Sequence, residues 1–262
     1  MPDANELLHQ GDLAGARAAL VEKVRAHPSD EQARMFLFQL LALTGEWDKA
    51  RTQVQALAQL SAKAQMLAAA YGQAIEAEAV RNAVFAGTAR AEVIGDPNGW
   101  AIGLAEAIQL LARGDSDAGL AARDAAFDKA PDCPGSLNDR PFEWIADADG
   151  RFGPSFEIII AGRYGLVPFD AVDRITSDGP VDLRDLIWYP VQIGFKSGQS
   201  VAAFLPARYP GTEGADDNQQ RLARATGWAA TAWGDAGSGQ HLWTLSDGED
   251  HGLLALRTLV FD

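Results

Sequence analysis

The chain has 262 residues, of which 47% are hydrophobic and 22% charged, and its 36 acidic and 22 basic side chains give a net charge of −14. This composition is that of an ordinary globular protein, and the length is sufficient for two domains. Both halves of the chain are acidic, which argues against nucleic acid or an anionic membrane as the principal partner.

The sequence also indicates a compartment. Cys133 is the only cysteine, so no internal disulfide can form, and a reducing environment fits. The opening MPDANELLHQGD lacks both the basic and the apolar segment of a secretory signal. The strongly apolar stretch 35–43 is too short to cross a bilayer. We therefore expect a cytoplasmic protein that does not use a membrane as its partner.

A short motif recurs in the first half of the chain. GDLAGA (11–16) and GEWDKA (45–50) are offset by 34 residues, and a third copy, GDSDAG, occupies 114–119. A period of 34 residues is typical of tetratricopeptide units, in which a Gly–acid pair begins the second helix of each helix pair. The segments between the copies are rich in Ala, Leu and Gln with helical periodicity. A generic helical bundle with a chance echo is the alternative.

We therefore predict that residues 1–133 form a tetratricopeptide-like superhelix in which Trp47 packs between helices. The middle copy is the weakest, because Ala62 stands where the other two copies have a closing proline. Residues 62–96 are accordingly expected to form an irregular extra pair of helices.

The pattern changes after the helical half. The turn-rich stretch 134–141 is predicted to be a linker, and 142–262 shows short apolar runs separated by Gly, Pro and Asp. These runs predict one helix over 215–225 and three β-hairpins, which pair 156–161 with 165–169, 190–195 with 200–205, and 241–246 with 253–261. The predicted fold class is α+β with two domains: an all-α tetratricopeptide-like superhelix, then a smaller α+β domain with a mainly antiparallel sheet.

Acidic residues and histidines in the second half raise the question of a metal site. D-A-D-G (147–150) resembles the start of a calcium loop, but Arg151 and Phe152 stand where an acid and the obligatory glycine are needed, so an EF-hand is excluded. Three acids and two histidines surround the turn at 247–251, and a solvated turn is favoured over metal ligation. The alternative function is a metal-dependent hydrolase that uses Asp147, Asp149, His241 and His251.

Other catalytic signatures are missing from the sequence. Cys133 lies between an acid and a proline, with no basic neighbour that would lower the pKa of its thiol. G-x-S-x-G, H-E-x-x-H and C-x-x-C do not occur. We therefore predict a protein that is not an enzyme and that has no catalytic residue, cofactor or metal ion.

The stretch FLPARYPGTEGADD (204–217) concentrates proline, arginine, tyrosine, glycine and acids. It is interpreted first as a structural corner, in which Arg208 pairs with an acidic neighbour and Thr212 caps a short helix that begins at residue 215. A docking surface is the second interpretation. An active-site loop is third, because no base or nucleophile accompanies the stretch.

Five distinctive segments cover most of the chain: FLFQLLALTGEW (36–47), PFEWIADADGRFGP (141–154), GRYGLVPF (162–169), VDLRDLIWYP (181–190) and LPARYPGTE (205–213). Together and in this order they resemble the ImpE family, also called TagJ or SciE, an accessory component of bacterial type VI secretion. The resemblance implies a tetratricopeptide-like domain followed by an α+β domain, without known catalytic activity. It also implies a partner, the N-terminal helix of the contractile sheath's small subunit TssB, and an indirect link to the ATPase ClpV.

A partner helix requires aromatic and polar anchors on a surface. Aromatic rings cover apolar area, and an arginine beside a tyrosine at a turn can bond helix-terminal carbonyls or acids. The candidate partner-binding residues are Arg208, Tyr209, Pro210, Arg163, Tyr164, Trp144 and Trp188, and Trp228 is a further aromatic candidate. For each aromatic ring, a place in the core is the alternative.

Overall fold

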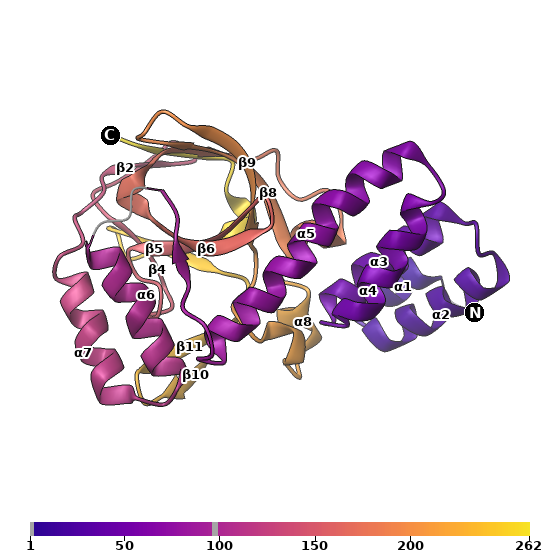
Figure 1. The fold of residues 1–262 in the computed structure, drawn as a ribbon, viewed down its shortest axis with the longest axis horizontal. Helices are drawn as coiled ribbons and strands as arrows, with labels where there is room; N and C mark the ends of the chain where they lie inside the picture. The colour runs from indigo at the N-terminus through magenta and orange to yellow at the C-terminus, as the bar shows by residue number, and fades with distance from the viewer. Residues whose placement is uncertain (1–2, 96–98) are drawn as a thin grey trace.

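A computed structural model describes residues 3–95 and 99–262. The first half of the chain is helical and the second half consists mainly of strands (Figure 1). The helices of the first half are α1 (Ala4–His9), α2 (Leu13–Ala26), α3 (Glu31–Leu43), α4 (Trp47–Ala58), α5 (Ala62–Phe85), α6 (Gly99–Ala112) and α7 (Ser116–Phe127). Residues 1, 2 and 96–98 of the predicted helical domain lie outside the described part of the chain.

Each copy of the repeated motif marks the turn before the second helix of a pair. Gly11, Gly45 and Gly114 have φ angles of 80°, 71° and 85°, a region that glycine enters without steric cost. Helices α2, α4 and α7 each begin two residues later. The predicted turn is confirmed at all three places, whereas the tetratricopeptide-like classification of the helices stays a prediction.

The described residues of the segment 62–96, which are 62–95, do not form the predicted extra pair of helices. They contain one continuous helix of 24 residues, α5, which the side chain of Ser61 caps by accepting from the backbone of Ala64. The sequence of α5 is rich in alanine and free of proline, which favours one long helix. Strand β1 (Glu92–Val93) follows and pairs in parallel with β6 of the sheet. Helix α5 lies between the α1–α4 group and the α6–α7 pair (Figure 1), so it interrupts the series of helix pairs.

The second half contains three sheets. Its strands are β2 (Gly135–Leu137), β3 (Arg140–Phe142), β4 (Ile145–Asp147), β5 (Ser155–Ile160), β6 (Arg163–Pro168), β7 (Val172–Thr176), β8 (Trp188–Phe195), β9 (Ser200–Pro206), β10 (Thr226–Thr231), β11 (Gly234–Gly239), β12 (Leu242–Leu245), β13 (Asp250–Gly252) and β14 (Thr258–Phe261). The largest sheet has nine strands in the order β1-β6-β5-β9-β8-β7-β14-β2-β3; β13-β12-β4 and β10-β11 form two smaller sheets. Apart from β1 with β6, the assigned strand pairs of the described residues are antiparallel, and the predicted α+β class is confirmed.

The segment predicted as a linker, 134–141, contributes to the large sheet. Strand β2 pairs with β14 on one side and with β3 on the other. Asn138 and Asp139 form the turn between β2 and β3, with φ angles of 48° and 67°. The turn-forming residues therefore mark a hairpin and not a free connector. The position of a boundary between two domains stays a prediction.

Two of the three predicted hairpins are confirmed, β5–β6 and β8–β9. The third is wrong in its second strand, because β12 pairs with β13 (Asp250–Gly252) and not with 253–261. That later run divides into a short 3-10 helix, η4 (Leu253–Ala255), and β14, which joins the large sheet. Leu253, Leu256 and Leu259 of this run are buried, so the apolar run contributes to the core and does not extend the hairpin.

The predicted helix over 215–225 is also much shorter in the structure. Helix α8 (Asn218–Arg221) starts after Asp217, whose side chain accepts from the backbone of Gln219. It ends before Ala223, which has a φ of 53°. Further 3-10 turns are η1 (Phe169–Ala171), η2 (Leu183–Leu186) and η3 (Thr212–Gly214).

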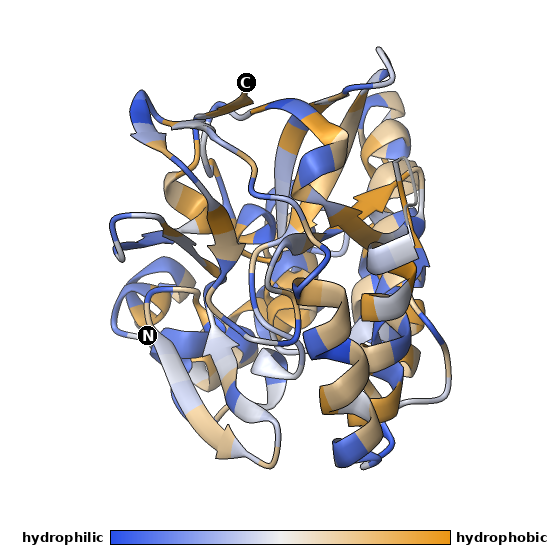
Figure 2. Ribbon diagram, turned by 90° about the vertical axis from the view of Figure 1, so that its left-hand side faces the viewer, coloured by the Kyte–Doolittle hydropathy of each residue, from blue (hydrophilic) through white to orange (hydrophobic). Residues whose placement is uncertain are grey.

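One hydrophobic core is shared by the two halves of the chain. It contains Leu40 and Tyr71 from the helices together with Ile159 and Trp188 from the sheet. A second core fills the interior of the sheet region, around residues such as Trp243. Hydrophobic and hydrophilic residues alternate along the helices, as expected when one face packs against these cores (Figure 2). Among the helices described, none combines the length and apolar character that crossing a membrane requires.

Candidate functional site

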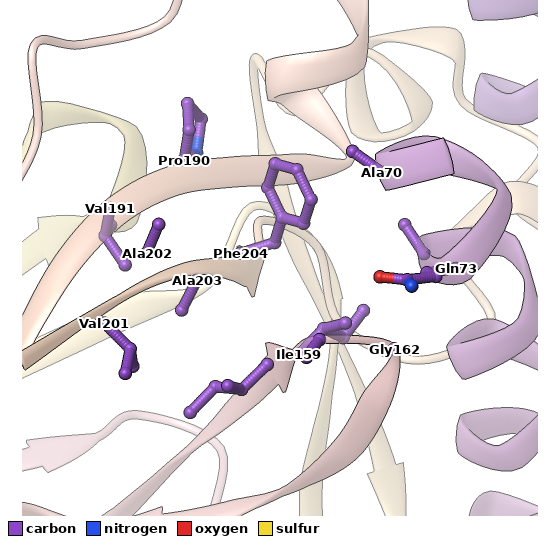
Figure 3. A pocket seen from close by; sticks show the side chains of 13 residues that line it. Ala70, Gln73, Ile159, Gly162, Pro190, Val191, Val201, Ala202, Ala203 and Phe204 are labelled. Atoms are coloured by element: carbon purple, nitrogen blue, oxygen red, sulfur yellow. The ribbon is translucent and has the colours of Figure 1, made fainter. Parts of the chain in front are cut away.

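An open apolar groove lies between helix α5 and the sheet (Figure 3). Its volume is about 420 Å³. The lining residues come from α5, from the end of β5 with its following turn, and from β8 and β9: Ala70, Gln73, Ala74, Ile159, Ile160, Ala161, Gly162, Pro190, Val191, Val201, Ala202, Ala203 and Phe204. None of these described residues carries a charge, so the groove is suited to an apolar ligand surface.

The groove exists because the first residues of β9 extend past the end of the antiparallel strand β5. Ala161 and Gly162 have φ angles of 48° and 79°, so the chain turns back into β6 directly after β5. The registered pair between β5 and β9 is Ile159 with Phe204. Strand β9 begins at Ser200, and its first residues therefore extend past the end of β5 and line the groove.

Small residues on both walls leave room for large side chains from another molecule. Two alanines of α5 and two of β9 line the groove. At Gly162, an added Cβ atom would lie 3.2 Å from the Cβ atom of Gln73, so glycine permits the close approach of the turn to α5. Phe204 lines the groove and packs on Tyr71 of α5, with 5.4 Å between the ring centroids.

A buried ionic network joins α5 to the sheet further along the same helix and strand. Glu157 of β5 accepts hydrogen bonds from Nε and Nη2 of Arg81, each at 2.7 Å, and from the Tyr164 hydroxyl at 2.7 Å. Burial alone would raise the pKa of the Glu157 carboxyl, but the charge and hydrogen bonds of Arg81 hold that pKa well below its usual range. Glu157 is therefore an ionised carboxylate in the interior of the protein.

His241 extends this network to a second carboxylate. Its Nδ1 lies 2.7 Å from Asp147 and its Nε2 lies 2.9 Å from Glu157. Asp147 also accepts from the Tyr209 hydroxyl at 2.9 Å. Burial alone would lower the pKa of His241, but the charge of Asp147 and the hydrogen bonds to both carboxylates raise it to about 9. Both ring nitrogens face carboxylates, so a protonated ring that donates through both of them satisfies the site.

The four residues of the metal-hydrolase alternative do not form one site. The carboxylate of Asp149 accepts hydrogen bonds from the side chain of Arg151 and from the backbone N–H of Gly237, the latter at 2.8 Å. His251 lies on β13, where it pairs with Trp243 of the neighbouring strand. Across residues 3–95 and 99–262, no three His, Cys, Asp or Glu side chains are placed to hold a metal ion. The expectation that His241 belongs to a solvated turn is wrong, because its side chain is buried.

Comparison with known proteins places the chain in a family. The ImpE protein family matches residues 139–260. The type VI secretion system accessory component TagJ of Pseudomonas aeruginosa is 41% identical over 261 residues, which cover 99% of this chain and 91% of that protein. The chain belongs to the ImpE family. The crystal structure of protein VPA1032 from Vibrio parahaemolyticus has the same fold, with a TM-score of 0.88 at 20% identity, covering 99% of this chain and 97% of that one.

Four of the predicted partner-binding residues of this ImpE-family chain are buried. The exposed fractions of Trp188 and Tyr209 are 0%, and those of Tyr164 and Arg208 are 2% and 4%. Their side chains bond inside the protein; the indole of Trp188, for example, donates to Glu78 at 2.9 Å. These four residues are therefore not surface anchors, and the alternative of a place in the core applies to them.

Polar side chains of the stretch 204–217 form hydrogen bonds with other segments of the chain. Arg208 donates to the backbone carbonyls of Leu43, at 3.0 Å, and Arg221, at 2.6 Å, and not to a neighbouring acid. Thr212 donates to the carbonyl of Tyr209 at 2.7 Å and accepts from a backbone N–H of β11 at 2.9 Å, so it does not cap a helix at residue 215. The stretch is a structural corner that links the C-terminal end of α3 to the sheet region.

The remaining predicted residues are more accessible but do not line the groove. Arg163 is exposed and pairs with the exposed Glu92 of β1. Trp144 and Trp228 are among the exposed large hydrophobic residues, and Pro210 is half-buried. A role for them in partner binding stays a prediction.

The ionic network of this ImpE-family protein was missed by the reasoning from sequence, although a signal was present. Glu157 is an acid inside the apolar run FEIIIA, which was predicted to be a strand. Glu78 and Arg81 are spaced three residues apart in an alanine-rich helix. Charged residues in such positions are rarely buried unless they are paired. The sequence could therefore have singled out the three residues as charges that need a partner in the core, but not which residues pair.

Proposed function

We propose that this protein is a non-catalytic, cytoplasmic accessory component of a bacterial type VI secretion system, and that it binds the N-terminal helix of the sheath small subunit TssB. The observation that carries the proposal is the open, uncharged groove between α5 and the sheet. Membership of the ImpE family and the 41% identity to a protein named as such an accessory component support the role. Binding to the sheath subunit would link the protein indirectly to ClpV.

The groove has the chemistry that an amphipathic helix needs. Such a helix presents apolar side chains at positions i, i+3, i+4 and i+7 to a hydrophobic groove. Small residues on the walls, such as Ala70 and Ala202, give these side chains room. The net charge of −14 favours a partner with basic residues beside its apolar stripe, mainly through the association rate.

The buried polar groups support a non-catalytic role. His241 bonds to both Asp147 and Glu157, and each of the two carboxylates also accepts from a tyrosine hydroxyl within the protein. Each of the three side chains is at most 3% exposed. A substrate therefore has no path to these groups in this conformation.

A titration of groove variants with a labelled TssB N-terminal peptide tests the proposal. Ala202→Trp and Ala70→Arg place bulk or charge on the groove walls, whereas Ala69→Arg changes an exposed neighbour on α5 that does not line the groove. We expect the two groove variants to weaken binding at least tenfold, with circular dichroism and melting temperature unchanged, and Ala69→Arg to bind like the wild type. Wild-type affinity in Ala202→Trp would place the helix elsewhere, and a wild-type protein that does not bind the peptide would refute the proposed partner.

A further inference from the structure

Helix α5 and strand β5 carry both the groove and the ionic network. Ala74, Glu78 and Arg81 are spaced four and three residues apart, so they lie on one face of α5. Glu157 and Ile159 are two residues apart and share one face of β5. Ala74 and Ile159 line the groove. The network therefore connects the same two faces that form the groove, about two helical turns further along α5.

The ion pair between Arg81 and Glu157 restricts the position of helix α5 relative to strand β5. The guanidinium and the carboxylate meet through two hydrogen bonds of 2.7 Å, and their side chains are only 7% and 1% exposed. A bidentate pair fixes orientation as well as distance. Arg81 also donates to the backbone carbonyl of Arg208 at 2.7 Å, so a third segment holds the guanidinium in place.

A second path runs from the network to the groove through aromatic rings. Glu78 forms an ion pair with Arg81 at 3.6 Å and accepts a hydrogen bond from the indole of Trp188 at 2.9 Å. The ring of Trp188 lies 5.7 Å from that of Tyr71, and Tyr71 lies 5.4 Å from Phe204, measured between centroids. Phe204 lines the groove (Figure 3). A continuous series of contacts between side chains therefore connects Glu78, beside Arg81, to the groove.

We propose that Arg81 and Glu157 are positioning residues for the groove: their ion pair sets the spacing between α5 and β5, and this spacing determines whether a partner helix fits. The inference rests on the proposed function for the identity of the ligand. The spacing itself is a property of the free protein. Without the pair, α5 can move relative to β5, and the groove loses its preformed width.

The test compares Arg81→Met and Arg81→Lys with a control in the helical core. Arg81→Met removes the charge and both hydrogen bonds, whereas Arg81→Lys keeps the charge without the bidentate geometry. Leu104→Ala, in α6, truncates a side chain that is 1% exposed and does not line the groove, so it serves as the destabilised control. Two quantities are measured: hydrogen exchange of amides 70–77 and 200–204 in the free protein, and the affinity for the TssB N-terminal peptide.

We expect Arg81→Met to accelerate exchange in both groove segments at least tenfold beyond Leu104→Ala, and to weaken peptide binding at least tenfold. Arg81→Lys is expected to lie between Arg81→Met and the wild type, and it supplies the comparison if Arg81→Met does not fold. Groove exchange in the folded Arg81 variants equal to that in Leu104→Ala would overturn the positioning role. If the wild-type protein does not bind the peptide, the proposed function fails, and the exchange data still decide the role of Arg81.

Discussion

Raising the pH above neutrality is expected to remove the stabilisation that protonated His241 gives the fold. The pKa of His241 is raised from 6.5 to about 9 in the folded protein. Because the folded pKa exceeds the unfolded one, the stabilisation is fully present below pH 6.5 and is lost as the pH rises through about 9. At about 1.4 kcal/mol per pKa unit, the gain is on the order of 3 kcal/mol. This figure is an upper value for the stabilisation. Burial raises the pKa of Asp147, and the cost of burying its charged form offsets part of the gain from His241.

Guanidinium unfolding followed by circular dichroism, at a series of pH values from about 6 to 9.5, measures this effect. His241→Gln removes the titrating ring, and His251→Gln is the matched control on β13, outside the network. We expect the unfolding free energy of the wild type and of His251→Gln to fall together over this range. His241→Gln should start lower and change less. A His241→Gln curve that runs parallel to the wild type would refute the assignment of the pH dependence to His241.

Three further variants test the packing. Glu157→Gln is expected to cost about 3–5 kcal/mol, because Arg81 and the protonated histidine would then face a neutral amide, and denaturant unfolding measures the loss. Trp47→Ala is expected to lower the unfolding free energy by about 2 kcal/mol. This is less than the cost of truncating a fully buried aromatic ring, because Trp47 is half-buried against a tryptophan of β8. An unchanged melting temperature would show that this packing does not stabilise the fold. Arg163→Ala should leave the melting temperature unchanged, since its ion pair is exposed, and a clear decrease would contradict that view.

Local features of the fold could be predicted from the sequence because they depend on a few neighbouring residues. The glycines at 11, 45 and 114 adopt positive φ angles at the predicted turns. The β5–β6 and β8–β9 hairpins follow from short apolar runs on either side of turn residues. Turn residues alone do not determine which strands pair. Strands β13 and β14 follow one another in the sequence, but they belong to different sheets.

The candidate site could not be predicted, because it depends on contacts between distant segments. Arg81 and Glu157 are separated by 76 residues, and no short-range pattern relates them. An arginine beside a tyrosine at a turn is equally compatible with a surface and with a buried corner. In the structure Arg208 bonds carbonyls at Leu43 and Arg221, which only the tertiary fold brings together. The groove likewise depends on the stagger between β5 and β9, which the pairing of Ile159 with Phe204 sets.

Site-specific photo-cross-linking tests whether the groove binds the N-terminal helix of the sheath small subunit. A photoreactive amino acid at position 202 lies in the groove, whereas the same residue at position 102, an exposed isoleucine of α6 outside the groove, serves as the control. With the full-length sheath small subunit as partner, we predict an adduct from position 202 that maps to the N-terminal helix of TssB, and none from position 102. An adduct from position 102 without one from position 202, or an adduct at 202 that maps outside the N-terminal helix, would contradict binding of that helix in the groove.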